Sequence, residues 1–396
     1  DKNILCIYNN YKMSIITNIQ KNDFECSFVL NNVDKSLVNA LRRTIMSEIS
    51  TIKFRTEPIE QNDVIIKKNT CALHNEFITH RIGMIPINIQ NIEEFDSSKY
   101  TFTLNVKNDT NIMRNVTTAD FKVYFDEDSG EKKEIDASKF FEPDPITGEY
   151  IIITQLKPDQ FGKSEGETLE IEAKTSIGTG RENAGYSPVS KAVFYNTMDQ
   201  DKINLEIKKI IQEKETKSGK LNKIEKQKIE KQFNNMEAHR HFHTNNKGEP
   251  NKFNFEIESV GILNVNYIMN QAILLIEQNI NYFNRIVNDE NEDIEITESD
   301  TVMDGIDILV KNQSHTLGNL IQSYLFINFV EEQAKLKFVG YKIIHPLENN
   351  LIIRIQTTED GDFKVKKQIV KDIIQENTEK LNLILKTIRK EWNSYK

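Results

Sequence analysis

A short sequence pattern occurs twice in this chain, once towards each end. The first copy is LVNALRRTIM at residues 37–46, and the second is LGNLIQSYL at residues 317–325. In both, a leucine is followed two residues later by an asparagine, and a helical apolar pattern continues from there. A repeat this widely spaced predicts two related domains in one chain, which pack against each other as a pseudo-symmetric dimer.

Each copy predicts a strand, a polar turn and an amphipathic helix. In the second helix the apolar residues recur at the i, i+3, i+4, i+7 spacing of one face, and Ser314 can cap it; in the first, Leu37, Leu41, Ile45 and Ile49 run down one side. Further apolar helical patterns cover about residues 265–287 and 365–392. We therefore expect an α+β fold in which each copy has an antiparallel sheet and two amphipathic helices. Burying one Leu or Ile contributes about 1.5–3 kcal/mol, so facing stripes favour an intramolecular pseudo-dimer.

The residues that follow each copy carry a resemblance to a known family. The first copy continues into TIKFRTEPIEQN (51–62) and ALHNEFITHRIGMIPI (72–87), and the second into KFVGYKIIHPLENNLIIRIQTTED (337–360). The first half resembles the alpha-like subunits of multisubunit RNA polymerases, namely bacterial alpha, archaeal D and the third-largest subunit of polymerase II. The second half resembles their smaller partner, archaeal L. The presence of both halves in one chain resembles the fused subunits of large cytoplasmic DNA viruses of the mimivirus type.

This resemblance, together with composition, implies a domain organisation. The D-like dimerisation domain is expected to be interrupted by a mainly β inserted domain, whose short strands alternate with acidic turns. The apolar-poor stretch NDENED is expected to start a linker. The expected parts are an N-terminal extension at 1–23, the D-like domain at 24–61 and 186–287, the inserted domain at 62–185, a linker at 288–302 and the L-like domain at 303–396.

A charged insertion at about 201–250 has no counterpart in the family pattern. Its Lys and Glu alternation over residues 201–231 favours an exposed helix, or a helical pair interrupted at Ser218 and Gly219. Two interpretations stay open, a solvated insertion and a basic patch that contacts a polymerase partner or nucleic acid.

Composition excludes several classes of function. A formal net charge of -9 argues against a surface that wraps nucleic acid, so any such contact should be local. Three cysteines without a pattern exclude a disulfide framework and fit a reducing compartment. No apolar run approaches the length that a membrane-spanning helix needs, so we expect no membrane span.

We expect no catalytic site, metal or cofactor. No nucleophile elbow, phosphate-binding loop or CxxC pair occurs. His239, His241 and His243 in HRHFH lack an obvious fourth ligand, and residues 88–120 contain no Cys, unlike family members with a zinc loop or iron-sulfur ligands in this region.

The resemblance implies a non-catalytic assembly subunit of a DNA-directed RNA polymerase, with the catalytic residues in other subunits. It would act in transcription as the platform for the largest and second-largest subunits, with small subunits as further partners, and would meet DNA only through the complex. Its expected location is the virion and host cytoplasm, or otherwise the nucleus or cytoplasm of the source cell. The alternative is a free-standing nucleic-acid-binding or transcription accessory protein that uses residues 201–231.

The expected subunit interface combines the apolar faces of the two repeats with nearby polar groups. Guanidinium groups suit fixed carboxylate or carbonyl partners across an interface. In alpha-like subunits the position of Arg42 and Arg43 lies on the surface that docks a large subunit, whereas the HR pair of HRIGMIP could hold either the inserted domain or a partner. The candidate residues are Leu37, Asn39, Leu41, Arg42, Arg43, Ile45, His80, Arg81, Leu317, Asn319, Leu320, Ile321 and Tyr324.

Overall fold

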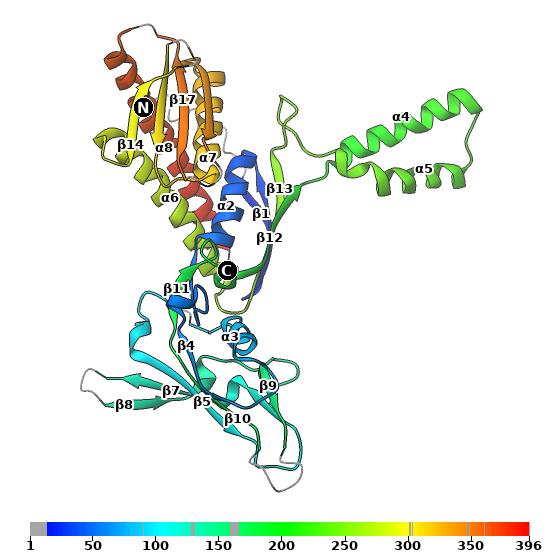
Figure 1. The fold of residues 1–396 in the computed structure, drawn as a ribbon. Helices are drawn as coiled ribbons and strands as arrows, with labels where there is room; N and C mark the ends of the chain where they lie inside the picture. Colours follow the sequence, from blue (N-terminus) through cyan, green and yellow to red (C-terminus); the bar gives the residue numbers. More distant parts are fainter. Residues whose placement is uncertain are drawn as a thin grey trace. The chain divides into compact units, whose positions relative to one another are not determined.

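The chain divides into two compact units in a computed structural model (Figure 1). The structure describes residues 14–395, except 90, 128–130, 159–165, 301, 303, 346, 348 and 360, so residues 1–12 of the expected extension lie outside the described part. Unit 1 comprises Asp1–Thr44, Ala192–Ile257 and Asn270–Lys396, and unit 2 comprises Ile45–Lys191 and Glu258–Met269. Several elements, including α2 and α6, continue from one unit into the other.

The first copy of the repeat forms a four-stranded antiparallel sheet with two helices. Its sheet has the order β1 (Ile16–Lys21), β2 (Glu25–Asn31), β13 (Lys252–Ser259), β12 (Val189–Asn196). Its helices are α2 (Lys35–Ser47) and α6 (Val265–Asp289).

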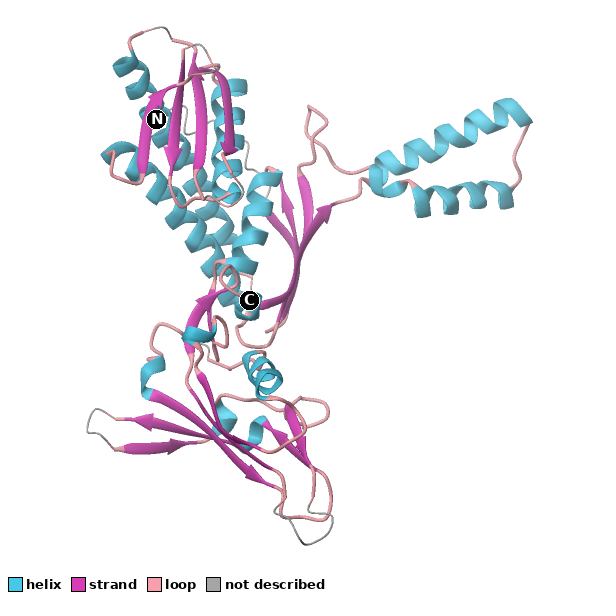
Figure 2. Cartoon of the chain, viewed as in Figure 1, coloured by secondary structure: helices cyan, strands magenta, loops and turns pink. Residues whose placement is uncertain are grey.

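The second copy repeats this arrangement element by element. Its sheet has the order β14 (Ile294–Glu298), β15 (Gly305–Val310), β17 (Leu351–Thr357), β16 (Leu336–Ile343), and its helices are α7 (His315–Leu325), which continues into the π-helix η7 (Phe326–Glu332), and α8 (Phe363–Ser394). Along the sequence, β15 begins as many residues after β2 as α7 begins after α2, so strand and helix repeat with one common offset. The predicted duplication and the α+β class with antiparallel sheets are therefore confirmed (Figure 2).

Two strands lie in segments for which the sequence predicts an extension and a linker. Strand β1 lies within the expected extension at 1–23, and β14 lies within the expected linker at 288–302. Both are polar edge strands with half-buried or exposed residues over most of their length. β1 carries isoleucines among polar residues and β14 only a short alternation of isoleucine with polar residues, and pairing with β2 and β15 completes the strands.

Two insertions interrupt the first copy at loops that are short in the second. The polypeptide of unit 2 enters between α2 and β12, whereas in the second copy β16 follows η7 closely. Between β12 and β13 the chain forms a helical hairpin of α4 (Gln200–Ser218) and α5 (Lys223–Met236), with Gly219 at φ +82° ending α4 (Figure 1). The predicted helical pair with a break at Gly219 is thus present.

Unit 2 is mainly β. Its largest sheet has the order β4 (Val64–Asn69), β10 (Thr168–Ala173), β5 (Tyr100–Lys107), β7 (Phe121–Asp126), β8 (Lys132–Ile135). Two smaller sheets pair β11 (Ser176–Thr179) with β3 (Ser50–Lys53) and β6 (Arg114–Thr117) with β9 (Ile152–Leu156), and α3 spans Asn75–Gly83.

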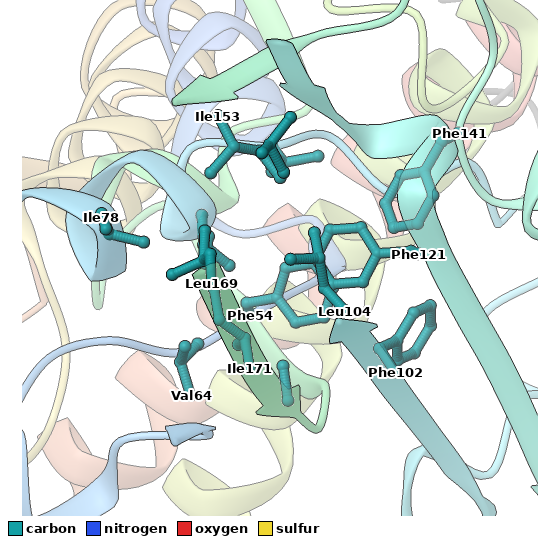
Figure 3. Packing of buried hydrophobic residues seen from close by; sticks show 14 of the residues in the cluster. Phe54, Val64, Ile78, Phe102, Leu104, Phe121, Phe141, Ile153, Leu169 and Ile171 are labelled. Carbon is teal, nitrogen blue, oxygen red and sulfur yellow. The ribbon is translucent and has the colours of Figure 1, made fainter. Parts of the chain in front are cut away.

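An aromatic cluster fills the core of unit 2. Phe54 lies edge-on to Phe102 at 5.2 Å between ring centroids and stacks on Phe121 at 5.9 Å, with aliphatic side chains of β4, β5 and β10 around them (Figure 3). This core makes unit 2 a folded body with its own buried interior.

Candidate assembly interface

The helices α6 and α8 hold the two copies of the repeat together inside unit 1. Asn270 and Asn393 exchange side-chain hydrogen bonds of 3.0 and 3.1 Å, and Asn382 Nδ2 donates to Asn281 Oδ1 at 2.7 Å. Asn270 and Asn281 on α6 are separated by the same number of residues as Asn382 and Asn393 on α8. The first asparagine of α6 pairs with the last of α8, and the second of α6 with the first of α8. The helices therefore run antiparallel in a register fixed by these amides.

The end of α8 packs on the first sheet around Trp392, whose side chain is 0% exposed. Its ring meets that of Phe28 edge-on at 5.4 Å, and Phe28 stacks on Phe255 at 5.2 Å. The Nζ atom of Lys21 lies 5.0 Å from the centre of the Trp392 ring. One aromatic core is thus shared by β2 and β13 of the first copy and α8 of the second.

A carboxylate beside this core ties α8 to the edge strand β1. Glu391 Oε2 accepts hydrogen bonds from the backbone N–H of Ile16 at 2.7 Å and from Ser14 Oγ at 2.9 Å. Hydrogen bonds to a charged acceptor are stronger than those between neutral groups. The contact therefore adds polar specificity to the apolar packing.

The helices of the original sequence motif also meet. Arg43 Nε donates to Thr316 Oγ1 at 2.7 Å, so an arginine of α2 contacts the start of α7. Arg42 instead turns back on its own helix, where Nε and Nη2 lie 3.2 and 3.1 Å from Asn39 Oδ1. Burial lowers the pKa of Arg42, and the neighbouring Arg43 charge lowers it further. Arg43 is exposed, while Arg42 is half-buried.

The remaining candidate residues fall into a core group and a surface group. Asn39 and Asn319 are half-buried on their helices. His80 and Arg81 are exposed on α3 in unit 2, where Arg81 Nη2 donates to the carbonyl oxygen of Ile152 at 2.7 Å. The buried candidates, each at most 6% exposed, are Leu37, Leu41, Ile45, Leu317, Leu320, Ile321 and Tyr324.

Sequence reasoning missed the residues that join α8 to the first copy. Trp392 appears in the sequence only as the end of an apolar helical pattern, and neither Glu391 nor the asparagine pairs are among the candidate residues. A usable signal was present, because two amphipathic helices carry asparagines at the same spacing. That spacing is close to a whole number of helical turns, which places both asparagines of a helix on one face.

Nothing in the described part of the chain forms a candidate metal centre or a membrane-spanning helix. No group of three or more His, Cys, Asp or Glu side chains there is placed to hold a metal ion. His243 Nδ1 instead lies 3.5 Å from Asp199 Oδ2, and Asp199 caps the start of α4. No helix within the same residues has the length and apolar character needed to cross a bilayer.

Comparison with known proteins explains the duplicated architecture. Two models described as the RNA polymerase Rpb3/Rpb11 dimerisation domain match the chain, one over residues 27–280 and the other over residues 306–391. The chain belongs to the Rpb3/Rpb11 family. Each matched region contains one copy of the repeat, so the family's dimerisation domain is present twice.

Curated relatives are similar over part of their length. The chain is 28% identical over 186 residues to DNA-directed RNA polymerase II subunit rpb3 of Dictyostelium discoideum, covering 44% of this chain and 54% of that one. It is 26% identical over 172 residues to DNA-directed RNA polymerase subunit Rpo3 of Methanobrevibacter smithii, covering 43% and 54%. A conjugation stage-specific protein of Tetrahymena thermophila is 28% identical over 191 residues, covering 45% and 57%. The chain thus spans just over half the length of these relatives.

Proposed function

We propose that this protein is a non-catalytic assembly subunit of a DNA-directed RNA polymerase, on which the two largest subunits meet. The observation that carries the proposal is the pair of Rpb3/Rpb11 dimerisation domains in one chain, joined by the α6–α8 contact and the core around Trp392. Relatives named as polymerase subunits support membership of such a complex.

The finer assignment is that the chain fuses a D-like half with an L-like half. The first half carries the large insertion that forms unit 2, whereas the second half is compact, and the sequence resemblance described above gives the same division. On this view the domain limits follow the sequence-based proposal, with β1 and β14 added to the two dimerisation domains. The viral origin, and with it a location in virion and host cytoplasm, rests on that resemblance alone.

The docking face for a large subunit is proposed to include Arg42 and Arg43. Arg43 Nε donates to Thr316 Oγ1 of the second copy, so this surface is already organised by the pairing of the two copies. Losing a charge buried at a protein interface costs about 2–5 kcal/mol. That loss corresponds to roughly one to three orders of magnitude in affinity.

Co-purification tests the function directly. A tagged chain should retain two very large partner subunits at high salt, and the double variant Arg42→Ala/Arg43→Ala should retain less of the second-largest subunit. The variant's own stability should fall by about 1–3 kcal/mol, because the hydrogen bonds of Arg43 to Thr316 and of Arg42 to Asn39 are lost at about 0.5–1.5 kcal/mol each. The matched control is Arg240→Ala/Arg285→Ala, which removes two exposed arginines.

The outcomes separate the competing interpretations. Leu37→Ala/Leu41→Ala should lose stability first and assembly as a consequence, because both leucines are 3% exposed. A chain that purifies without large partners would contradict the platform and favour a free-standing nucleic-acid-binding protein. Wild-type assembly of the double arginine variant would refute the docking face alone.

A further inference from the structure

The α4–α5 hairpin is a folded element with its own small core. Ile203, Ile207, Phe233 and Ala238 are buried against one another. Asn222 and Glu225 form a capping box at the start of α5. Lys226 of α5 pairs with Glu215 of α4 at 2.8 Å. The hairpin therefore presents fixed faces.

The solvent side of α5 is rich in lysine and amide side chains. Lys226, Ile229 and Phe233 are turned towards the hairpin interior, as the ion pair and the burial show. By the 3.6-residue period, the sides turned away from the interior carry six exposed side chains that can donate hydrogen bonds, together with the exposed Ile224 and Glu230. We call these six residues the α5 outer face: Lys223, Gln227, Lys228, Lys231, Asn234 and Asn235.

The side chains of the α5 outer face are unengaged. None of the six makes a side-chain hydrogen bond or ion pair with any residue that the structure describes. Three carboxylates of the hairpin are in use elsewhere, because Glu206 pairs with Lys209, Glu215 with Lys226, and Glu225 closes the capping box. Residues 200–236 hold ten lysines and six acidic residues, a local charge of +4 in a chain whose net charge is -9.

We propose that the α5 outer face binds the phosphate backbone of duplex DNA without reading its sequence. This inference rests on the proposed function, since a DNA-directed polymerase subunit acts close to a duplex. The three lysines of this face span about 12 Å of helix, at about 1.5 Å per residue. One strand of duplex DNA places a phosphate about every 3.4 Å along its axis, so several phosphates lie within that span. Asn and Gln amides also donate to phosphate oxygens.

The residue types favour a duplex backbone over the other acidic partners. Protein interfaces are enriched in Arg and aromatic residues and depleted in Lys, whereas residues 200–236 contain no Arg. Binding of single strands relies on aromatic stacking, and the aromatic residue of this segment, Phe233, is buried. Lysine as a point charge is suited to sequence-independent phosphate contact.

Fluorescence anisotropy with the full chain and a labelled 30-base-pair duplex tests the proposal. The variant is Lys223→Gln/Lys228→Gln/Lys231→Gln, and the matched control is Lys364→Gln/Lys386→Gln/Lys390→Gln, which removes three exposed lysines of α8. With three phosphate contacts the slope of log affinity against log salt should be shallower in the variant by about 2.7. Between about 50 and 200 mM salt, wild-type affinity should therefore fall roughly 40-fold more than that of the variant.

Four results would overturn the proposal. The first is that the wild type does not bind the duplex at the lower salt concentration, and the second is that the control variant loses as much affinity as the lysine variant. The third is that the wild type binds a single strand of the same length more tightly, and the fourth is that it prefers duplex RNA. A variant that keeps its duplex affinity but loses a polymerase subunit in the pull-down would make the face a protein-docking surface instead. Because anisotropy uses the isolated chain, its result is independent of whether the large subunits co-purify.

Discussion

Replacing Phe28 by Ala should destabilise the contact between the two copies, and Trp392 reports on that contact. Phe28 is 2% exposed and lies between the rings of Phe255 and Trp392. A buried Phe→Ala substitution costs about 3–5 kcal/mol, part of which is the lost ring pairing. With a urea dependence of about 3 kcal/mol per molar, the unfolding midpoint should fall by roughly 1–2 M.

Tryptophan emission gives a site-specific assay, because Trp392 is the only tryptophan in the sequence and is fully buried. The matched control is Phe24→Ala, since Phe24 lies in the turn between β1 and β2 and is 39% exposed. This control should change stability by less than about 0.5 kcal/mol. Equal midpoints for the two variants would refute the shared aromatic core, as would a wild-type emission maximum already at the wavelength of solvent-exposed tryptophan.

Three further predictions concern the halves, acid stability and metal content. Residues 13–288 and 294–396, expressed separately and mixed, should co-elute in size-exclusion chromatography, because each exposes a helix stripe that the other covers; two independent monomers would contradict this. Asp307 is paired with Arg354 through two 2.6 Å contacts, and the guanidinium lowers the pKa of Asp307. The stability that this pair contributes is present above the ordinary carboxyl pKa and is lost as pH falls through the lowered pKa. In urea titrations, acidification from pH 5 to 3 should therefore lower the unfolding free energy of the wild type by about 1 kcal/mol more than that of Asp307→Asn. Equal losses in the two proteins would argue against the pair. Elemental analysis should find no stoichiometric zinc or iron, and metal that disappears when the three histidines of residues 239–243 are mutated would show the expectation to be wrong.

The duplicated core could be predicted because its signal is local and occurs twice. Apolar spacing in α2 and α7 is enough to identify each helix, and the same offset that relates these helices also relates β2 to β15. The α4–α5 hairpin was also predictable, because its Lys and Glu composition favours helix and Gly219 ends α4 with a positive φ.

The rest could not be predicted because it depends on distant partners. β14 alternates Ile294 and Ile296 with polar residues, which is a strand signal, but it is short and follows an acidic stretch, and its pairing with β15 supplies the strand. The sequence presents Arg43 as a free interface charge, yet it donates to Thr316, a residue 273 positions away. That Arg43 faces a large subunit stays a prediction.

The connection between the two copies has a consequence for stoichiometry. Only a few residues separate α6, which ends at Asp289, from β14, which begins at Ile294. A tether this short gives the second copy an effective concentration in the millimolar range, so pairing does not weaken as the protein is diluted. A homodimer would carry the large insertion and the hairpin on both sides, whereas this chain carries one of each. Carrying both copies in one chain therefore makes the two sides of a two-fold architecture permanently different, because the sequence itself decides which copy carries the insertions.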